Sequence, residues 1–359
     1  EKGFSPALVN PLDPFNFGKK HHFVGVFFYT NQMSSVLTGI TTNGSPHLGN
    51  YVGAMRPAIE LSKKSKSFIF LADYHSLIKQ QDPKLTHQST LSIAAAWIAC
   101  DLDLKNTIFY RQSSIPQIME LNWILTSITP KGLMNRAHAY KALQDSTSGK
   151  DKDRNVQMGL FNYPILMSSD ILIFNADLIP VGSDQKQHIE MTRDIANKFN
   201  LTYGSFFNLP EPLIDETNSY LPGLDGNKMS KSYSNYIDLF SEEKKLQKQI
   251  NQIKTDSLEP GEKKPKDSTL YEYFKCFTND KEIKQIDAYF DEGMGWGDLK
   301  KELFKLINAE IAPAREKYFD LVNNPKKVEK LLKEGEAKAL KIASKNLKEI
   351  RSLVGINSL

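Results

Sequence analysis

The fold of this 359-residue chain is decided by residues 36–51, which read Val-Leu-Thr-Gly-Ile-Thr-Thr-Asn-Gly-Ser-Pro-His-Leu-Gly-Asn-Tyr. The first five residues are apolar or β-branched apart from one glycine, so they predict a short buried strand. A turn cluster follows from Thr41 to Gly44, and a helical pattern begins at about Leu48. A strand that leads through a glycine-containing turn into a helix is typical of a parallel α/β sheet.

Strand and helix patterns go on alternating beyond this unit. Predicted strands cover residues 36–40, 68–72, 107–110 and 178–181, and predicted helices cover 48–61, 85–99 and 184–199. This alternation favours an α/β fold with a doubly wound parallel sheet of Rossmann type, which binds ligands at the carboxyl ends of its strands. Residues 33–235 are therefore predicted to form the catalytic domain.

Three regions depart from this alternation. Residues 116–165 have a helical period and few strand signals, and they are predicted to be a helical insertion. Residues 236–359 repeat Lys, Glu, Gln and Leu at helical spacing, which predicts a C-terminal α-helical domain in which Pro313 starts a helix. Residues 1–32 are rich in Phe, Pro and Asn, and we expect them to be an extension upstream of a natural start at Met33.

The composition limits the class of protein. The chain is 40% hydrophobic and 25% charged with a net charge of +4, which permits contact with RNA but falls short of the dense positive charge of a dedicated DNA binder. Cys100 and Cys276 form no Cys-x-x-Cys pattern, so no cysteine metal site is expected. No apolar run is long enough to span a bilayer, and we expect a cytoplasmic protein with neither DNA nor a membrane as partner.

The segment around His47 is suited to binding phosphate. A helix that starts directly after a strand presents free N–H groups and the positive end of its dipole at the carboxyl edge of the sheet. Gly49 lets a ligand approach the backbone, and the ring of His47 can donate a hydrogen bond to a phosphate oxygen. Taken alone, a histidine beside Gly-Asn is equally well explained as a structural feature.

A second segment, residues 225–232, reads Asp-Gly-Asn-Lys-Met-Ser-Lys-Ser. Lys228 and Lys231 supply two ammonium groups, and Ser230 and Ser232 supply two hydroxyls, which together can grip a polyphosphate. A solvated basic turn is the alternative interpretation of this segment by itself.

Together the two segments resemble the paired motifs of class I aminoacyl-tRNA synthetases. His-Leu-Gly-Asn at residues 47–50 stands where that family usually has His-Ile-Gly-His, and residues 228–232 match its Lys-Met-Ser-Lys-Ser in full. Residues 163–172 read Tyr-Pro-Ile-Leu-Met-Ser-Ser-Asp-Ile-Leu, and residues 179–188 read Ile-Pro-Val-Gly-Ser-Asp-Gln-Lys-Gln-His. Both blocks look like bacterial tryptophanyl-tRNA synthetases.

The resemblance implies a two-step reaction. L-Tryptophan is activated by ATP, with Mg²⁺, to tryptophanyl-adenylate and pyrophosphate, and tryptophan then passes to the 3′-terminal ribose of tRNA(Trp). The catalytic residues would be Lys228, Lys231 and His47, which act by positioning and charge stabilisation without a protein nucleophile or a resident metal. A homodimer formed through the helical insertion and tRNA anticodon recognition by residues 236–359 are also implied, although the aromatic residues at 271–274 favour core packing over base stacking.

The resemblance also assigns two sets of site residues. The ATP-binding set is Thr41, Thr42, Asn43, His47, Gly49, Asn50, Gly182, Ser183, Asp184, Leu221, Lys228, Met229, Ser230, Lys231 and Ser232. The tryptophan-binding set is Leu37, His75, Met167, Asp170, Ile179, Val181 and Gln185. Asp170 is expected to accept the indole N–H, because the indole nitrogen only donates and a carboxylate among apolar residues needs a donor. A structural salt bridge is the alternative role for this carboxylate.

One departure from the family and three alternative functions stay open. Many bacterial tryptophanyl enzymes have Gln-Pro-Ser-Gly where this chain has Thr41 to Gly44, so the role of residues 41–43 is undecided. The alternatives are the same chemistry with tyrosine, a synthetase-like protein that binds nucleotide or RNA without charging tRNA, and a small nucleotidyltransferase with a related histidine motif. The intact motifs argue against the second, and the long helical tail argues against the third.

Overall fold

The computed structural model describes residues 34–147, 149–182, 185–214 and 221–357, so the expected extension and start at Met33 lie outside the described residues. Its centre is a five-stranded parallel sheet in the order β3-β2-β1-β4-β5. The strands are β1 (Ser35–Thr41), β2 (Lys66–Ala72), β3 (Thr107–Arg111), β4 (Leu178–Pro180) and β5 (Glu211–Leu213). This is the strand order of a Rossmann-type sheet, so the predicted fold class is confirmed.

The strand order reverses between β1 and β4. The chain runs outward from β1 through β2 to β3, and after the helical insertion it returns to the other side of β1 with β4 and β5. Ligands of doubly wound sheets bind outside the carboxyl ends of the strands at this switch point. The predicted site segments begin at Thr41, the last residue of β1, and at Val181, directly after β4, so both begin at this place.

Helices connect the strands and continue beyond them. Up to β5 they are α1 (Leu48–Asn50), the π-helix η1 (Tyr51–Met55), α2 (Arg56–Ser62), α3 (Asp73–Ser76), α4 (Pro83–Ala99), η2 (Gln112–Ser114), α5 (Pro116–Ile128), α6 (Lys131–Met134), α7 (His138–Ser146), α8 (Met158–Leu172) and α9 (Lys186–Tyr203). After β5 they are η4 (Lys231–Tyr233), α10 (Glu243–Asn251), α11 (Thr269–Phe277), α12 (Glu282–Asp291), α13 (Trp296–Asn323) and α14 (Pro325–Leu353). Between β3 and β4 the chain forms η2 and the helices α5–α8, in the region where the insertion was predicted.

Two hydrophobic clusters cover opposite faces of the sheet. Successive side chains of β2 alternate between them, with Ile69 and Leu71 in the first cluster and Phe68 and Phe70 in the second. The first cluster also takes apolar residues from α2, α4 and α10–α13, and the second takes them from α5, α8 and α9. Burial on both faces explains why β2 reads as one continuous apolar run.

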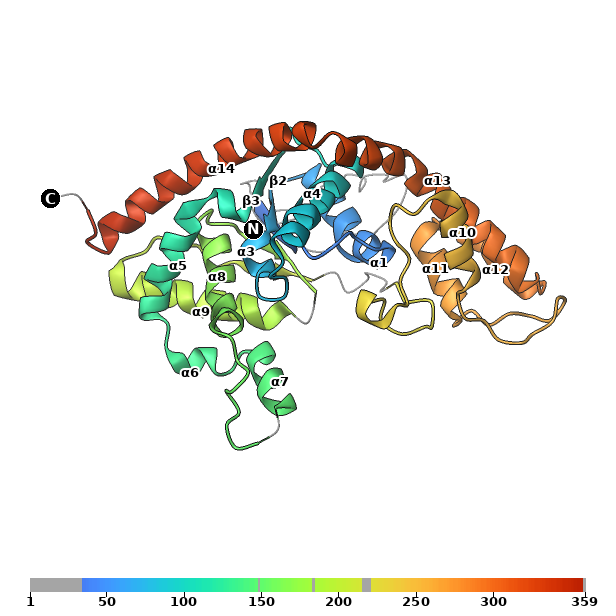
Figure 1. The fold of residues 1–359 in the computed structure, drawn as a ribbon, viewed down its shortest axis with the longest axis horizontal. Helices are drawn as coiled ribbons and strands as arrows, with labels where there is room; N and C mark the ends of the chain where they lie inside the picture. Colours follow the sequence, from blue (N-terminus) through green and yellow to red (C-terminus); the bar gives the residue numbers. More distant parts are fainter. Residues whose placement is uncertain (1–33, 148, 183–184, 215–220, 358–359) are drawn as a thin grey trace, which may run out of the picture.

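The last helix, α14, lies over the edge of the sheet formed by β3. Its Leu332 belongs to the first cluster and its Ala339 to the second, so the helix passes from one face to the other around this edge. Gly335 is at the crossing, where an added Cβ would lie 1.9 Å from the carbonyl oxygen of Phe109. Figure 1 shows α13 and α14 as a long arch along one side of the molecule. An edge strand has unpaired backbone groups, and a helix laid over it shields them.

Two predictions for the C-terminal helices have clear outcomes. Pro313 does not start a helix, because it lies inside α13. Burial of Ile307 and Ile311 in the first cluster stabilises this helix against the loss of the hydrogen bond that proline removes. Tyr273 and Phe274 are fully buried, so core packing of the aromatic segment is confirmed.

The domain boundary at residue 236 stays a prediction. No helix among the described residues is both long enough and apolar enough to cross a membrane.

Candidate active site

The helix that follows β1 begins at His47, and its first turn is closed by a capping box. Asn50 N–H donates to His47 Nδ1 at 3.2 Å, and His47 N–H donates to Asn50 Oδ1 at 3.1 Å. Because Nδ1 accepts, the neutral ring carries its proton on Nε2. Burial, and then the ammonium of Lys231, lower the pKa of His47 to about 4. His47 is therefore a neutral donor at pH 7, while the side-chain oxygen of Asn50 is engaged in the cap.

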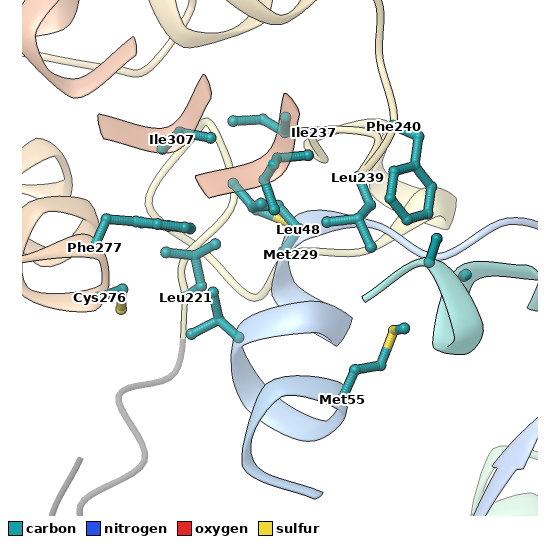
Figure 2. Packing of buried hydrophobic residues seen from close by; sticks show 14 of the residues in the cluster. Leu48, Met55, Leu221, Met229, Ile237, Leu239, Phe240, Cys276, Phe277 and Ile307 are labelled. Carbon is teal, nitrogen blue, oxygen red and sulfur yellow. The ribbon is translucent and has the colours of Figure 1, made fainter. Parts of the chain in front are cut away.

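The Lys-Met-Ser-Lys-Ser segment lies directly against this turn. Gly49 N–H donates to Met229 Sδ at 3.3 Å, and Leu48 N–H donates to Ile237 O at 2.8 Å. Met229 is 5% exposed and packs beside Leu48 in the first hydrophobic cluster (Figure 2). The structure thus brings together two motifs whose contacting residues are 180 positions apart. The Met229 side chain, expected among the ATP contacts, anchors the segment from the core.

The two lysines of the segment are placed differently. Lys231 is half-buried, its Nζ donates to Ser45 O, and desolvation lowers its pKa. A Cβ added at Gly44 would lie 2.8 Å from this Nζ, and the φ of +68° at Gly44 also favours glycine. Lys228 is exposed. One ammonium group therefore lies against the turn after β1, and the other faces solvent.

Asn235, which no sequence signal indicated, holds the segment in shape. Its buried side chain accepts from Ser230 N–H at 2.8 Å and donates to Lys228 O at 3.0 Å and to Asp225 Oδ1 at 2.8 Å. The hydroxyls of Ser230 and Ser232 bond to each other at 2.7 Å. These contacts exist only after the chain folds back on the motif, so residue type and spacing do not reveal them.

Asp170 lies on α8 at the centre of a buried polar network. Gln112 Nε2 donates to its Oδ1 at 2.8 Å and to its Oδ2 at 3.0 Å, and His75 Nε2 bonds to Oδ2 at 2.8 Å. Desolvation raises the pKa of Asp170, and the hydrogen bonds from His75 and Gln112 oppose this shift. The carboxylate, at 0% exposure, thus has the donors that a buried charge requires.

Gln112 is the second important residue that the sequence interpretation missed. It directly follows β3 and is fully buried, and its Oε1 accepts from Tyr74 N–H at 3.1 Å and from His75 N–H at 3.4 Å. One carboxamide therefore joins the backbone of α3 to Asp170. A polar residue immediately after a buried strand, at the same sheet edge as His75, is the signal that could have identified it.

Near this network the carboxyl end of β1 is open on one face. Leu37, Gly39 and Thr41 share that face, and Leu37 is buried whereas Gly39 and Thr41 are exposed. An added Cβ at Gly39 would lie 2.4 Å from Cζ of Phe70, so only glycine fits. The Phe70 ring fills the place of this Cβ, and the exposed backbone of Gly39 and Thr41 keeps surface that a ligand can contact.

The apolar residues of the predicted tryptophan set lie at different depths. Leu37 and Ile179 are buried in the second hydrophobic cluster, on the face of the sheet that opens at Gly39. Met167 and Val181 are only partly buried against the same cluster. Leu37 and Ile179 therefore support the site from the core, and Met167 and Val181 keep surface that a ligand can contact.

A further polar chain runs through α8 and α9. Gln185, at the start of α9, bonds through Oε1 to His188 Nδ1 at 2.9 Å, and His188 Nε2 bonds to the hydroxyl of Tyr163. The Tyr163 ring is 6.3 Å from the ring of His75, measured between centroids. Tyr163 and His188 were not among the predicted site residues, yet they link Gln185 to the surroundings of Asp170.

The remaining predicted ATP contacts are placed as follows. Ser183 and Asp184 lie outside the described residues. Gly182 is exposed, and its carbonyl accepts from Gln185 N–H at 2.9 Å. Leu221 is 2% exposed within the first cluster (Figure 2), so in this conformation it has almost no surface for the expected contact with adenine.

Known proteins resemble this chain over most of its length. The family model described as tRNA synthetases class I (W and Y) matches residues 30–312. A tryptophan–tRNA ligase of Neisseria meningitidis is 52% identical over 330 residues, which is 90% of this chain and 98% of that protein. One from Xanthomonas axonopodis pv. citri is 51% identical over 337 residues, covering 92% and 78%. The structure of a Campylobacter jejuni tryptophanyl-tRNA synthetase with ADP and tryptophan has a TM-score of 0.81 at 40% identity, covering 89% of this chain and 99% of that one.

Proposed function

This chain belongs to the class I tRNA synthetases of the tryptophan and tyrosine type, and we propose that it joins L-tryptophan to tRNA(Trp) using ATP. It acts as a tryptophan–tRNA ligase that forms AMP and pyrophosphate. One observation supports the residue assignments below: the turn that begins at His47 contacts the Lys-Met-Ser-Lys-Ser segment, through Gly49 N–H and Met229 Sδ, next to the carboxyl end of β1. Tyrosine as the substrate is not favoured.

Asp170 is proposed to recognise the indole. Among the described residues, its Oδ2 accepts two hydrogen bonds and its Oδ1 accepts one, so Oδ1 keeps a lone pair for the indole N–H. Asp170 is fully buried, so the indole would reach it by displacing Met167, one turn earlier on α8. Phenylalanine would leave the lone pair unused, and a site built around a hydrogen bond rejects such an analogue.

Adenylate formation would follow from positioning and charge. The tryptophan carboxylate attacks the α-phosphorus of ATP, a C–O–P bond forms, and the bond to pyrophosphate breaks. The attacking carboxylate is already ionised, so no protein base is required. Lys228 and Lys231 would stabilise the leaving pyrophosphate, with a phosphate oxygen replacing Ser45 O as the partner of Lys231. His47 Nε2–H would donate to a phosphate or ribose oxygen.

Mg²⁺ is proposed to enter with ATP as part of the substrate. Across residues 34–147, 149–182, 185–214 and 221–357, no three His, Cys, Asp or Glu side chains gather as a metal-ligand group. Mg²⁺ is commonly held by substrate phosphates and water with few protein ligands, which suits a site built from lysines and a neutral histidine.

The second step needs tRNA, and we infer its course from the resemblance to the family. The 3′-terminal ribose hydroxyl attacks the adenylate carbonyl and AMP leaves, while residues 236–359 recognise the anticodon. A homodimer through α5 is proposed because Met119 and Trp123, one turn apart, are 41% and 73% exposed, and large exposed apolar side chains favour burial at an interface. A cytoplasmic location is proposed from the resemblance alone.

Charging of tRNA(Trp) tests the proposal. We expect the purified chain, with MgATP and labelled tryptophan, to form tryptophanyl-tRNA. Lys231→Ala should lower adenylate formation by about 100-fold or more, because a charge-stabilising donor is lost, and should leave tryptophan binding by calorimetry nearly unchanged. Absence of charging by the intact chain, or equal charging by the variant, would contradict the proposal.

A further inference from the structure

The turn at residues 41–44 is held by two serines from different helices. Thr42 N–H donates to Ser76 Oγ at 2.7 Å, and Gly44 N–H donates to Ser89 Oγ at 2.9 Å. Ser76 ends α3, and Ser89 lies in α4. Two N–H groups on either side of Asn43 are thus tied to two separate supports.

The Ser76 hydroxyl is used to its full hydrogen-bonding capacity. It accepts from Thr42 N–H at 2.7 Å and from Thr42 Oγ1 at 3.1 Å, and it donates to Ala72 O at 2.9 Å. A hydroxyl has one proton to donate and two lone pairs to accept with. Thr42 and Ser76 are both fully buried, so Ser76 lies too deep to touch a nucleotide. Its removal would leave two buried donors of Thr42 without a partner.

The residue between the two tied N–H groups has an unmet acceptor. Within the described part of the chain, Asn43 Oδ1 is buried and has no hydrogen-bond partner. Buried polar atoms are rarely left unpaired, so a donor from a ligand is the natural complement. A ribose hydroxyl or the adenine amino group can supply it. The next residue, Gly44, lies against Lys231 Nζ, which places this turn beside the phosphate-binding segment.

We propose that Ser76 and Ser89 are positioning residues for ATP, which fix the turn so that Asn43 accepts a hydrogen bond from the nucleotide. This inference rests on the proposed function, since it takes ATP as the ligand. A proline at the position of Thr42 would have a fixed φ and no N–H, so it would stiffen the turn without a partner. In this chain the Thr42–Ser76 pair supplies the same stiffness through hydrogen bonds.

ATP–pyrophosphate exchange and direct ATP binding by matched variants test whether Ser76 and Ser89 position the turn for ATP. Ser76→Ala and Ser89→Ala should each raise KM and Kd for ATP by about tenfold, with KM for tryptophan unchanged. Adding Thr42→Pro to Ser76→Ala should restore the ATP constants to within about threefold of the original, because proline needs no acceptor. Ser92→Ala, on the same helix as Ser89, is the control: its hydroxyl bonds to Tyr318 on α13 instead of to the turn, so the substitution should change neither constant.

The outcomes separate this inference from the proposed function. Unchanged KM and Kd for ATP in both serine variants would overturn the positioning role of Ser76 and Ser89. Equal losses of affinity for ATP and for tryptophan that Thr42→Pro does not restore would also overturn it, because they would indicate general destabilisation. Calorimetric ATP binding tests the positioning role even if no amino acid supports exchange. Failure of exchange by the unmodified chain would instead overturn the proposed function.

Discussion

The polar residues around Asp170 illustrate what sequence can and cannot reveal about a single side chain. Asp170 and His75 could be named in advance because each lies in a block of recognisable residues. Gln112, which bonds to both, is 58 positions from Asp170, and no local pattern records that contact. The resemblance likewise named Met229 and Leu221 without revealing that the core buries both side chains. Spacing predicts which residues gather at a sheet edge, while side-chain direction depends on the packing of the whole core.

Removing the Asp170 carboxylate should affect tryptophan selectively. For Asp170→Ala we expect KM for tryptophan to rise by about 100-fold or more, with KM for ATP little changed, because the acceptor for the indole N–H is lost. Steady-state exchange kinetics would measure both constants. Asp194→Ala, an exposed carboxylate on α9, is the matched control. Unchanged tryptophan affinity in Asp170→Ala would refute the role assigned to this carboxylate.

The pKa of His47 is a second prediction for a single residue. NMR titration of its ring, assigned with His47→Gln, should give a midpoint at about 4 instead of the ordinary 6.5, and Lys231→Ala should raise this midpoint. Because the folded state favours the neutral ring, its contribution to stability is full above pH 6.5 and declines as the pH falls toward 4, where the unfolded chain binds the proton first. A midpoint near 6.5 in the intact chain would show that the ring is not buried against Lys231.

Among the elements, strands β1–β4 and the first helices were predictable, whereas the short strand β5 and the path of the last helix were not. The predicted strand at 107–110 corresponds to β3 (Thr107–Arg111), because buried parallel strands are short apolar runs between turn signals. The periodicity of α14 indicates an apolar face but not the surface that this face covers. Pro313 misled because tertiary burial of α13 outweighs the local preference of proline to start a helix.

The crossing of α14 over β3 gives a prediction about stability. Gly335→Ala should lower the free energy of unfolding by about 1–3 kcal/mol or more, because the new methyl group would overlap Phe109 O and the helix would have to move off the strand. Gly297→Ala in α13 is the control, since no atom lies within 4 Å of its added Cβ, and it should be neutral or slightly stabilising. Urea denaturation would compare them. Equal stability of the two variants would argue against the close crossing.

In the whole molecule, the C-terminal arch is connected to the substrate network. Arg111, which precedes Gln112, donates to Glu336 Oε1 at 2.6 Å and to Glu329 Oε2 at 2.9 Å on α14. The arch that runs from α13 through α14 in Figure 1 therefore contacts the sheet beside the residue that holds Asp170. No sequence pattern indicates this connection, because Arg111 and Glu336 are 225 positions apart in the chain.

Assembly is a prediction at the same scale. Trp123→Glu should convert the proposed dimer to a monomer, because it places a charge in the apolar interface on α5. Sedimentation velocity at several concentrations would measure this. Leu85→Glu on α4, also an exposed large apolar residue, is the control and should leave the dimer intact. A chain that is monomeric without any substitution would contradict the proposed interface.

The central claim is that this chain activates tryptophan, and ATP–pyrophosphate exchange across the amino acids tests it most directly. The account predicts exchange that depends on tryptophan, with tyrosine and phenylalanine supporting less by a factor of about 1,000 or more, since neither offers the indole N–H. Exchange supported equally by tyrosine, or by no amino acid, would contradict it.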